Sequence, residues 1–214
     1  MRRIKKRVYD SSSRKAAAGR TRRSILDAAR RVFLEKGYAA ATMPAIADAA
    51  GVALDTVYAT VGKKPALFRL LIEMAISGSD RAVPAEERDY VEAIRQEKDA
   101  AKRLQIYAAA LRSIQQRLAP LFLVLQGAVP LDSELAALWD SVAQRRVKNM
   151  RLFAADLAAT GRLRRDLSVA KAADIIWSMN SPEFYLLLVQ QRGWSLKEFE
   201  DYLADSWIRL LLAP

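Results

Sequence analysis

Residues Gly37–Leu67 read GYAAATMPAIADAAGVALDTVYATVGKKPAL, and this stretch decides the fold. It contains two short helical patterns, residues 42–50 and 53–61, joined by an Ala-Gly-Val turn. Thr42 can cap the first helix, and Gly51 can adopt the backbone conformation that ends it. Because the alanines beside the turn are small, the two helices can cross closely, and the stretch predicts a helix-turn-helix.

The flanking residues extend this unit. A first helix is predicted from Thr21, as its N-cap, to a stop at Gly37, and a fourth begins near Lys64. The apolar residues that would hold the unit together are Ile25, Ala28, Ala29, Val32, Phe33, Ile46, Val52, Val57 and Val61. Their burial would expose one face of the third helix, which carries Leu54, Asp55, Thr56, Tyr58, Ala59 and Thr60. Presenting this face to the major groove of DNA suits a helix too short to be stable alone.

Positive charge is concentrated at the N-terminus. The net charge is +11, and residues 1–31 hold twelve Lys and Arg against Asp10 and Asp27. Residues 1–20 lack apolar periodicity and are expected to form a disordered basic arm, whose DNA-binding candidates are Arg2, Arg3 and Lys5. The arm could enter a minor groove or attract phosphates without specificity, and a merely solubilising tail is the plainer alternative.

Composition excludes several functions. The chain has no Cys and no His, which removes disulfides, imidazole catalysis and nearly every zinc site, so no catalytic residue, metal or cofactor is expected. The 52% hydrophobic content is enough for a packed core. Neither a secretory signal nor an 18-residue apolar stretch is present. We therefore expect a cytoplasmic protein with no membrane association.

The rest of the chain also predicts helices. Residues 78–85 read as a linker or helix break, and helical patterns follow at 86–98, 100–118, 119–128, 132–160, 168–191 and 195–212. No stretch alternates with period two for long enough to indicate a strand. The predicted fold is all-α, with a three-helix DNA-binding unit and a larger helical bundle. The expected divisions are the arm at 1–20, the helix-turn-helix domain at 21–66 and a ligand-binding and dimerisation domain at 67–214.

The N-terminal pattern resembles the TetR family of bacterial transcriptional regulators. The likeness covers Thr21–Leu71: RRSILDAARRVFLEKGY, then T-x-x-x-I-A-x-x-A-G-V, then T-V-Y, then Lys and a Leu-rich fourth helix. The C-terminal WSMNSPEFYLLL and WIRLLL are similar to the family less specifically. The resemblance implies a homodimer that binds a palindromic operator in double-stranded DNA, usually as a repressor released by a small-molecule inducer.

The resemblance also implies roles for individual residues. Thr42 would cap the second helix and touch a phosphate, and Thr56 would reach a base edge or a phosphate. Tyr58 matches a tyrosine that contacts the DNA backbone, Lys64 matches a phosphate-binding lysine, and Thr60 stands where His is common.

The starts of the third and fourth helices depart from the family pattern. Ala53 replaces a capping Ser, which weakens the start of the recognition helix unless Asp55 substitutes. Lys63 takes the usual cap position of the fourth helix. Two lysines at a helix N-terminus oppose its dipole, so Lys63 and Lys64 are interpreted as phosphate contacts, with solvated surface charge as the alternative. Asp55 would repel phosphate but could accept a hydrogen bond from cytosine, and the bases that are read stay open.

The second domain carries candidates for two roles. A pocket for a largely apolar ligand could be lined by Tyr107, Leu111, Phe122, Leu125, Gln126, Trp139, Met150, Phe153, Trp177 and Asn180. Plain core packing is the alternative for each of them. Gln126 and Asn180 are the most suggestive, because a buried amide needs a partner. By the resemblance, the last two helices form the dimer interface, with candidates Phe184, Leu188, Phe199, Tyr202 and Trp207.

The predicted function is a sequence-specific, ligand-responsive transcriptional regulator, most simply a repressor. An all-α enzyme is disfavoured by the missing His and Cys and by the lack of a phosphate-binding motif. The other alternative is an architectural protein that binds nucleic acid without specificity. The two DNA-binding hypotheses differ in the ratio of operator to random-DNA affinity.

Overall fold

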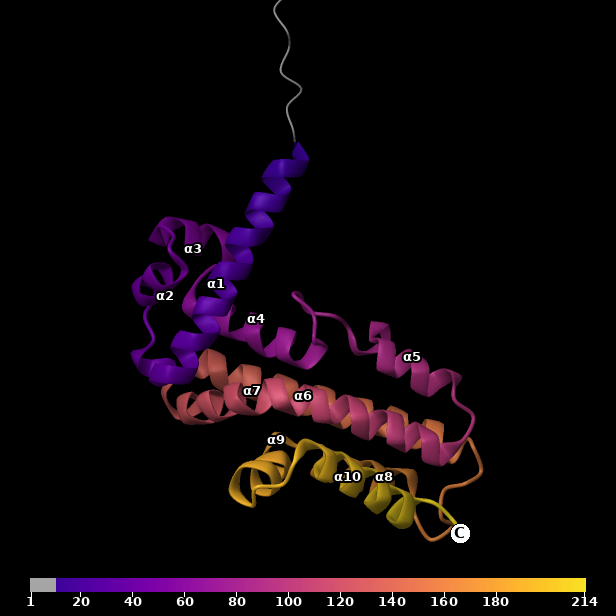
Figure 1. Ribbon diagram of the computed structural model, residues 1–214. Helices are drawn as coiled ribbons and strands as arrows, with labels where there is room; N and C mark the ends of the chain where they lie inside the picture. The colour runs from indigo at the N-terminus through magenta and orange to yellow at the C-terminus, as the bar shows by residue number, and fades with distance from the viewer. Residues whose placement is uncertain (1–10) are drawn as a thin grey trace, which may run out of the picture. The chain divides into compact units, whose positions relative to one another are not determined.

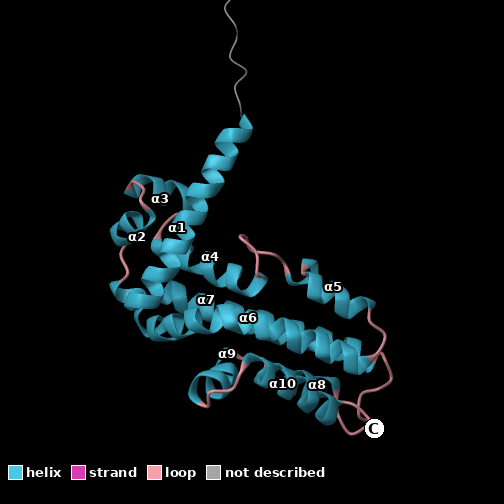
Figure 2. Cartoon of the chain, viewed as in Figure 1, coloured by secondary structure: helices cyan, strands magenta, loops and turns pink. Residues whose placement is uncertain are grey.

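The computed structural model describes residues 11–214, with the side chains of residues 11–13 and 131 left aside, and this part of the chain is helical (Figures 1 and 2). Within it no β-strand forms, and one antiparallel bridge pairs Leu163 with Leu212. The all-α prediction is therefore confirmed. No helix among the described residues is long and apolar enough to cross a membrane. The chain divides into two compact units, Met1–Leu67 and Phe68–Pro214.

The first unit contains α1 (Ser11–Ala40), α2 (Met43–Ala50), α3 (Leu54–Val61) and the start of α4 (Lys64–Ser77). At Gly37, α1 is interrupted by a left-handed φ of 71°. The start of α1 differs from the prediction: Thr21 lies inside the helix, and residues 11–20 are helical instead of forming part of a disordered arm. Their Lys and Ala residues are strong helix formers that produce no apolar periodicity. Arg2, Arg3 and Lys5 lie outside the described residues.

Buried apolar side chains hold the first unit together. Ile25, Phe33, Ile46 and Val57 are fully buried, as the sequence predicted, and Val61 is nearly so. The end of α2 is bonded to α1, because Ser24 Oγ donates to the carbonyl oxygen of residue 50 at 3.0 Å. The helix-turn-helix is thus fastened to the middle of α1.

The second unit is a helical bundle. It contains the end of α4, a 3₁₀ turn (Ala85–Glu87), α5 (Asp89–Gln96), α6 (Ala100–Ala128), a 3₁₀ turn (Val129–Leu131), α7 (Ser133–Ala158), α8 (Val169–Met179), α9 (Pro182–Tyr185), a π-helix (Leu186–Gln191) and α10 (Leu196–Leu211). The predicted helix boundary near Pro120 is wrong, because α6 continues through it. Proline removes one backbone donor, but Leu118, Leu121 and Phe122 are buried on both sides of it and maintain the helix.

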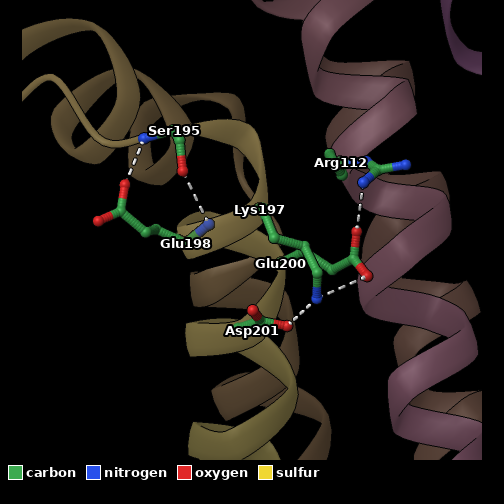
Figure 3. A network of polar contacts seen from close by, with 6 residues as sticks. All are labelled: Arg112, Ser195, Lys197, Glu198, Glu200 and Asp201. Carbon is green, nitrogen blue, oxygen red and sulfur yellow. Dashed lines mark hydrogen bonds and ion pairs between the residues drawn. The ribbon is translucent and has the colours of Figure 1, made fainter.

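The core of the bundle lies around α6, which packs against α5, α7 and α10. The Trp207 side chain is fully buried and its ring stacks on Tyr107, with 5.5 Å between centroids. Arg112 of α6 also forms a 2.9 Å ion pair with Glu200 of α10 (Figure 3). A capping box begins α10: the Ser195 and Glu198 side chains each accept a hydrogen bond from the other's backbone N–H (Figure 3).

The burial of α6 gives a first prediction. Leu104→Ala removes a fully buried side chain and should lower the free energy of unfolding by about 2–5 kcal/mol. Leu123→Ala is the matched control on the same helix: its side chain is 45% exposed, and the expected loss is about 1 kcal/mol or less. Urea denaturation followed by circular dichroism measures both, and equal losses would contradict the packing of α6.

Candidate functional site

The two faces of α3 have opposite characters. Val57 and Val61 point into the first unit and are buried. Asp55, Tyr58 and Ala59 are exposed, with 43% of Tyr58 accessible. The other predicted contacts on this helix, Leu54, Thr56 and Thr60, are half-buried. The structure therefore gathers the polar candidates of the helix on its outer face.

The caps of α2 and α3 differ. Thr42 Oγ1 accepts a hydrogen bond from the N–H of Ala45 at 3.2 Å, and Gly51 ends α2 in the left-handed conformation. Both features were predicted. At the start of α3, Ala53 supplies no side-chain cap, and Asp55 does not replace it. The position of α3 therefore depends on Val57 and Val61.

The two lysines before α4 have different surroundings. Lys63 is exposed. Lys64 Nζ lies 4.3 Å from the centroid of the Tyr38 ring and donates to the Ala39 carbonyl oxygen at 3.4 Å. Contact with an aromatic face stabilises an ammonium group and fixes its position. Lys64 therefore has a structural role within the first unit as well as any role toward a phosphate.

The exposed N-terminal part of α1 is basic. Arg14, Lys15, Arg20 and Arg23 all lie on exposed positions of one continuous helix. Because the helix fixes where these side chains leave the backbone, this segment presents its cations around an exposed helical surface. Its helical structure is the feature that the sequence reasoning missed.

A cavity of about 750 Å³ lies within the second unit. Of the predicted ligand contacts, Tyr107, Leu111, Met150, Phe153 and Asn180 line it. The others have different surroundings: Phe122 and Trp139 pack together with ring centroids 4.8 Å apart, Leu125 is buried outside the lining, and Trp177 lies behind the Arg146 guanidinium.

The prediction that Gln126 is a buried amide is wrong, because its side chain is exposed. The buried amide of α6 is Gln115, which is 2% exposed and lines the cavity. Gln115 lies four residues after Leu111 and Arg146 four residues before Met150, so helical spacing from the predicted residues could have found both. Both residues were missed because Gln126 was chosen for its place inside a long apolar run, and neither Gln115 nor Arg146 lies in such a run.

Asn180 is the centre of a buried hydrogen-bond network. Its Nδ2 donates to the Tyr107 hydroxyl at 2.8 Å, and its Oδ1 accepts from Arg146 Nε and Nη2 at 3.2 and 2.9 Å. Its backbone carbonyl accepts from Gln115 Nε2 at 2.7 Å. Burial raises the pKa of the Tyr107 hydroxyl, to which the neighbouring Tyr90 adds, and burial lowers the pKa of Arg146. Asn180 is therefore buried in the cavity wall, and its amide is bonded to side chains of the protein.

The predicted dimer residues fall into two groups. Phe199 and Trp207 are fully buried in the unit's own core. The prediction that these two side chains contact a partner subunit is therefore wrong. Phe184 and Leu188 are half-buried and Tyr202 is 43% exposed. Aromatic content alone does not distinguish the inner face of α10 from its outer face. Leu187 and Leu210 are also exposed in this C-terminal region.

Residues 25–71 match the family model of bacterial regulatory proteins of the tetR family, which confirms the resemblance over this region. The sequence matches none of the curated proteins with which it was compared. NalD, the secondary repressor of the MexAB-OprM multidrug efflux pump in Pseudomonas aeruginosa, has a similar fold: 20% identity, TM-score 0.70, covering 92% of this chain and 98% of NalD.

Two further solved structures share the fold. The fatty acid degradation regulator FadR from Bacillus halodurans is 20% identical, with a TM-score of 0.69 over 88% of this chain and 94% of FadR. A transcriptional regulator from Saccharomonospora viridis, in complex with choline, is 17% identical, with a TM-score of 0.67 over 92% of this chain and 100% of that protein. At these identities the similarity shows the fold.

The uncapped start of α3 gives a second prediction. Ala53 has the extended conformation of an N-cap residue (φ −66°, ψ 147°), so Ala53→Ser should place a hydroxyl near the first-turn N–H groups and stabilise the protein by about 1 kcal/mol. Thr42→Ala, which removes the existing cap of α2, should have the opposite effect of similar size. Thermal unfolding measures both changes, and a destabilising Ala53→Ser would show that the start of α3 has been wrongly described.

Proposed function

We propose that this chain, whose residues 25–71 match the tetR family of bacterial regulatory proteins, is a sequence-specific DNA-binding transcriptional regulator. It acts as a homodimeric repressor without enzymatic activity, in the cytoplasm at the bacterial nucleoid, and a small molecule releases it from a palindromic operator. The observation that carries the proposal is the outer face of α3, which is polar and exposed while Val57 and Val61 fix the opposite face.

The chemistry of the outer face of α3 suits a DNA duplex. Tyr58 carries an exposed hydroxyl on a rigid ring, which suits a hydrogen bond to a phosphate. Leu54, Asp55 and Thr56 occupy the first turn, the part of a recognition helix that reaches base edges. Asp55 accepts hydrogen bonds only, so cytosine is its natural target. Thr60 is a weaker candidate, because its hydroxyl donates to the Thr56 carbonyl oxygen at 2.6 Å.

The neighbouring helices α2 and α4 carry candidate phosphate contacts. Lys63 is exposed at the N-terminal end of α4, where the helix dipole also attracts anions. Lys64 and Thr42 complete the set, and the Thr42 hydroxyl can donate to a phosphate while its oxygen caps α2. The arm residues Arg2, Arg3 and Lys5 would add affinity on an adjacent groove or phosphate.

Release by a ligand is supported by α4 and the cavity. The helix begins with the two lysines, and its later residues Glu73 and Ile76 line the cavity. A rigid helix transmits a displacement of one end to the other, so a ligand that moves this part of α4 would also move the lysines. This continuity gives a physical route from cavity to DNA.

The alternative, an architectural protein that binds nucleic acid without specificity, is favoured by the basic N-terminal part of α1. The exposed cations of this segment would attract phosphates of any sequence. In that case the exposed polar face of α3 would not read base sequence. Relative affinity for different sequences separates the two functions.

A third prediction tests specificity. DNA selected from a random library by the purified protein should bind about 10³-fold or more tightly than random duplex in fluorescence anisotropy. Tyr58→Phe should lower that affinity by about three- to tenfold, the loss of one hydrogen bond, without changing the melting temperature. Ser133→Ala, which removes an exposed hydroxyl at the start of α7 in the second unit, is the control and should leave the affinity unchanged.

Equal affinity for selected and random DNA would establish the architectural alternative. If Tyr58→Phe instead lowered the melting temperature by several degrees, Tyr58 would belong to the core.

A fourth prediction concerns the dimer. Phe184, Trp194 and Tyr202 form an aromatic cluster, in which the ring centroids of Phe184 and Trp194 lie 6.4 and 5.2 Å from that of Tyr202. The exposed Leu187 lies on the π-helix that follows α9, and the exposed Leu210 lies on α10 with Tyr202. The double variant Leu187→Glu, Tyr202→Glu should be a folded monomer at micromolar concentration in light scattering, because it places charge in an apolar interface.

Leu123→Glu, at an exposed leucine of α6, is the control and should remain dimeric. A double variant that remains dimeric would place the interface elsewhere. Substitution of Trp207 cannot serve as this test. The side chain is buried in the core, so a charged replacement would unfold the unit before it affected a dimer.

A further inference from the structure

Polar side chains in the cavity wall are linked to one another. Arg146, Asn180, Tyr107 and Gln115 are joined by the hydrogen bonds around Asn180. The Tyr90 ring lies 6.1 Å from that of Tyr107, and Arg88 Nη1 lies 3.5 Å from the Tyr90 hydroxyl. The wall also has a large apolar part, with Ile76, Val91, Ile94, Leu111, Leu118 and Phe153. The cavity therefore suits a molecule with an apolar body and one polar head.

Two arginines of this polar part bond only to neutral acceptors. Arg146 donates to Asn180 Oδ1 and, at 2.8 Å, to the Trp177 carbonyl oxygen. Arg88 donates to the Val83 carbonyl oxygen at 3.1 and 3.0 Å. Among the residues that the structure describes, no carboxylate forms an ion pair with either of them, although Glu183 acts on Arg146 through space.

A third arginine of the wall behaves differently. Arg145, next in sequence to Arg146, is paired with Glu73 through both carboxylate oxygens. Among the described residues, the more exposed arginine thus has a paired carboxylate and the deeper one has none. A partly buried cation without a counter-ion lowers stability, and burial lowers the pKa of Arg146 accordingly. A charge kept at such a cost is typical of a binding group.

The charged residues of the lining are of both signs, and the basic ones outnumber the acidic ones. Its basic residues are Arg88, Arg95, Arg145, Arg146 and Lys148, and its acidic residues are Glu73, Glu86 and Asp156. Since Glu73 is bound to Arg145, the field that remains inside the cavity is positive. A cationic head group would be repelled by Arg88 and Arg146, whereas an anionic one would neutralise them.

We propose that the cavity binds an amphipathic carboxylate, with its head group on Arg146 and Arg88 and its apolar body along the aliphatic wall. This inference rests on the proposed function for its regulatory meaning. It also changes the ligand predicted from the sequence, which was largely apolar. The body is apolar, but the head group carries a negative charge.

The remaining polar groups fit a carboxylate head. Among the described residues, Arg146 Nη1 forms no hydrogen bond. The Tyr107 hydroxyl donates its proton only to Met150 Sδ, over a long distance of 3.5 Å. Both groups can donate to carboxylate oxygens. Gln115 Oε1 is a buried acceptor without a partner, which suits a hydroxyl or N–H beside the carboxylate, or a bridging water.

The test compares three ligands with the same ten-carbon chain: decanoate, decanol and decyltrimethylammonium. Calorimetric titration of the full-length protein without DNA, below micelle-forming concentrations, should show decanoate binding about tenfold or more tightly than the other two. Arg146→Gln keeps a donor toward Asn180 but removes the charge, and should lower decanoate affinity by about ten- to hundredfold while decanol affinity stays the same. Lys148→Gln, at an exposed residue of the same wall, is the matched control and should have a much smaller effect.

Three results would overturn the proposal: equal binding of the three probes, binding of none, or an Arg146→Gln variant that loses decanol as much as decanoate. If Arg146→Gln does not fold, Arg88→Gln removes the other positive charge proposed to bind the carboxylate and should also weaken decanoate binding. Arg146→Lys keeps the charge and should retain the preference for decanoate. A separate measurement of DNA affinity tests the regulatory role of the ligand. Decanoate that binds through Arg146 but leaves DNA affinity unchanged would contradict ligand-controlled release and leave the ligand class established.

Discussion

The burial of Val57 and Val61 is the constraint on which the first unit depends. An eight-residue helix with an uncapped N-terminus is not stable in water, so α3 exists because these side chains are held by the unit's core. That attachment also fixes which residues point outward. Since 3.6 residues make a turn, anchoring positions 57 and 61 leaves 55, 58 and 59 exposed. The surface chemistry of the recognition helix is thus a consequence of its packing.

In the second unit, Asn180 has a comparable place. The helix break between α8 and α9 brings its amide into the core, where Tyr107, Gln115 and Arg146 from two other helices bond to it. Such a network is stable only when its members are nearly all satisfied. The groups that are left over, Gln115 Oε1 and one nitrogen of Arg146, both belong to residues that line the cavity. Asn180 therefore both stabilises the core of the unit and positions the polar groups of the cavity wall.

How far the sequence predicts the structure depends on how local each feature is. The cap at Thr42, the turn at Gly51 and the buried face of α1 follow from neighbouring residues, and all three were predicted correctly. The helical start of α1 was missed because alanine and lysine favour a helix without apolar spacing. The inner position of Trp207 and the outer position of Gln126 depend on how helices distant in sequence pack together. Composition could not supply that information.

Coupling between a ligand and DNA requires a difference in free energy, typically about 1–3 kcal/mol, between two states of the protein. The ion pair between Glu73 and Arg145 connects α4 to α7, but the Arg145 side chain is 48% exposed, and such pairs contribute at most about 1 kcal/mol. Leu71, Ile72 and Ala75 of the same helix are buried. Burial of one Leu or Ile side chain is worth about 1.5–3 kcal/mol, so a partial loss of this packing covers the required range. We infer that repacking of the end of α4, more than its ion pair, would carry the signal of a bound ligand.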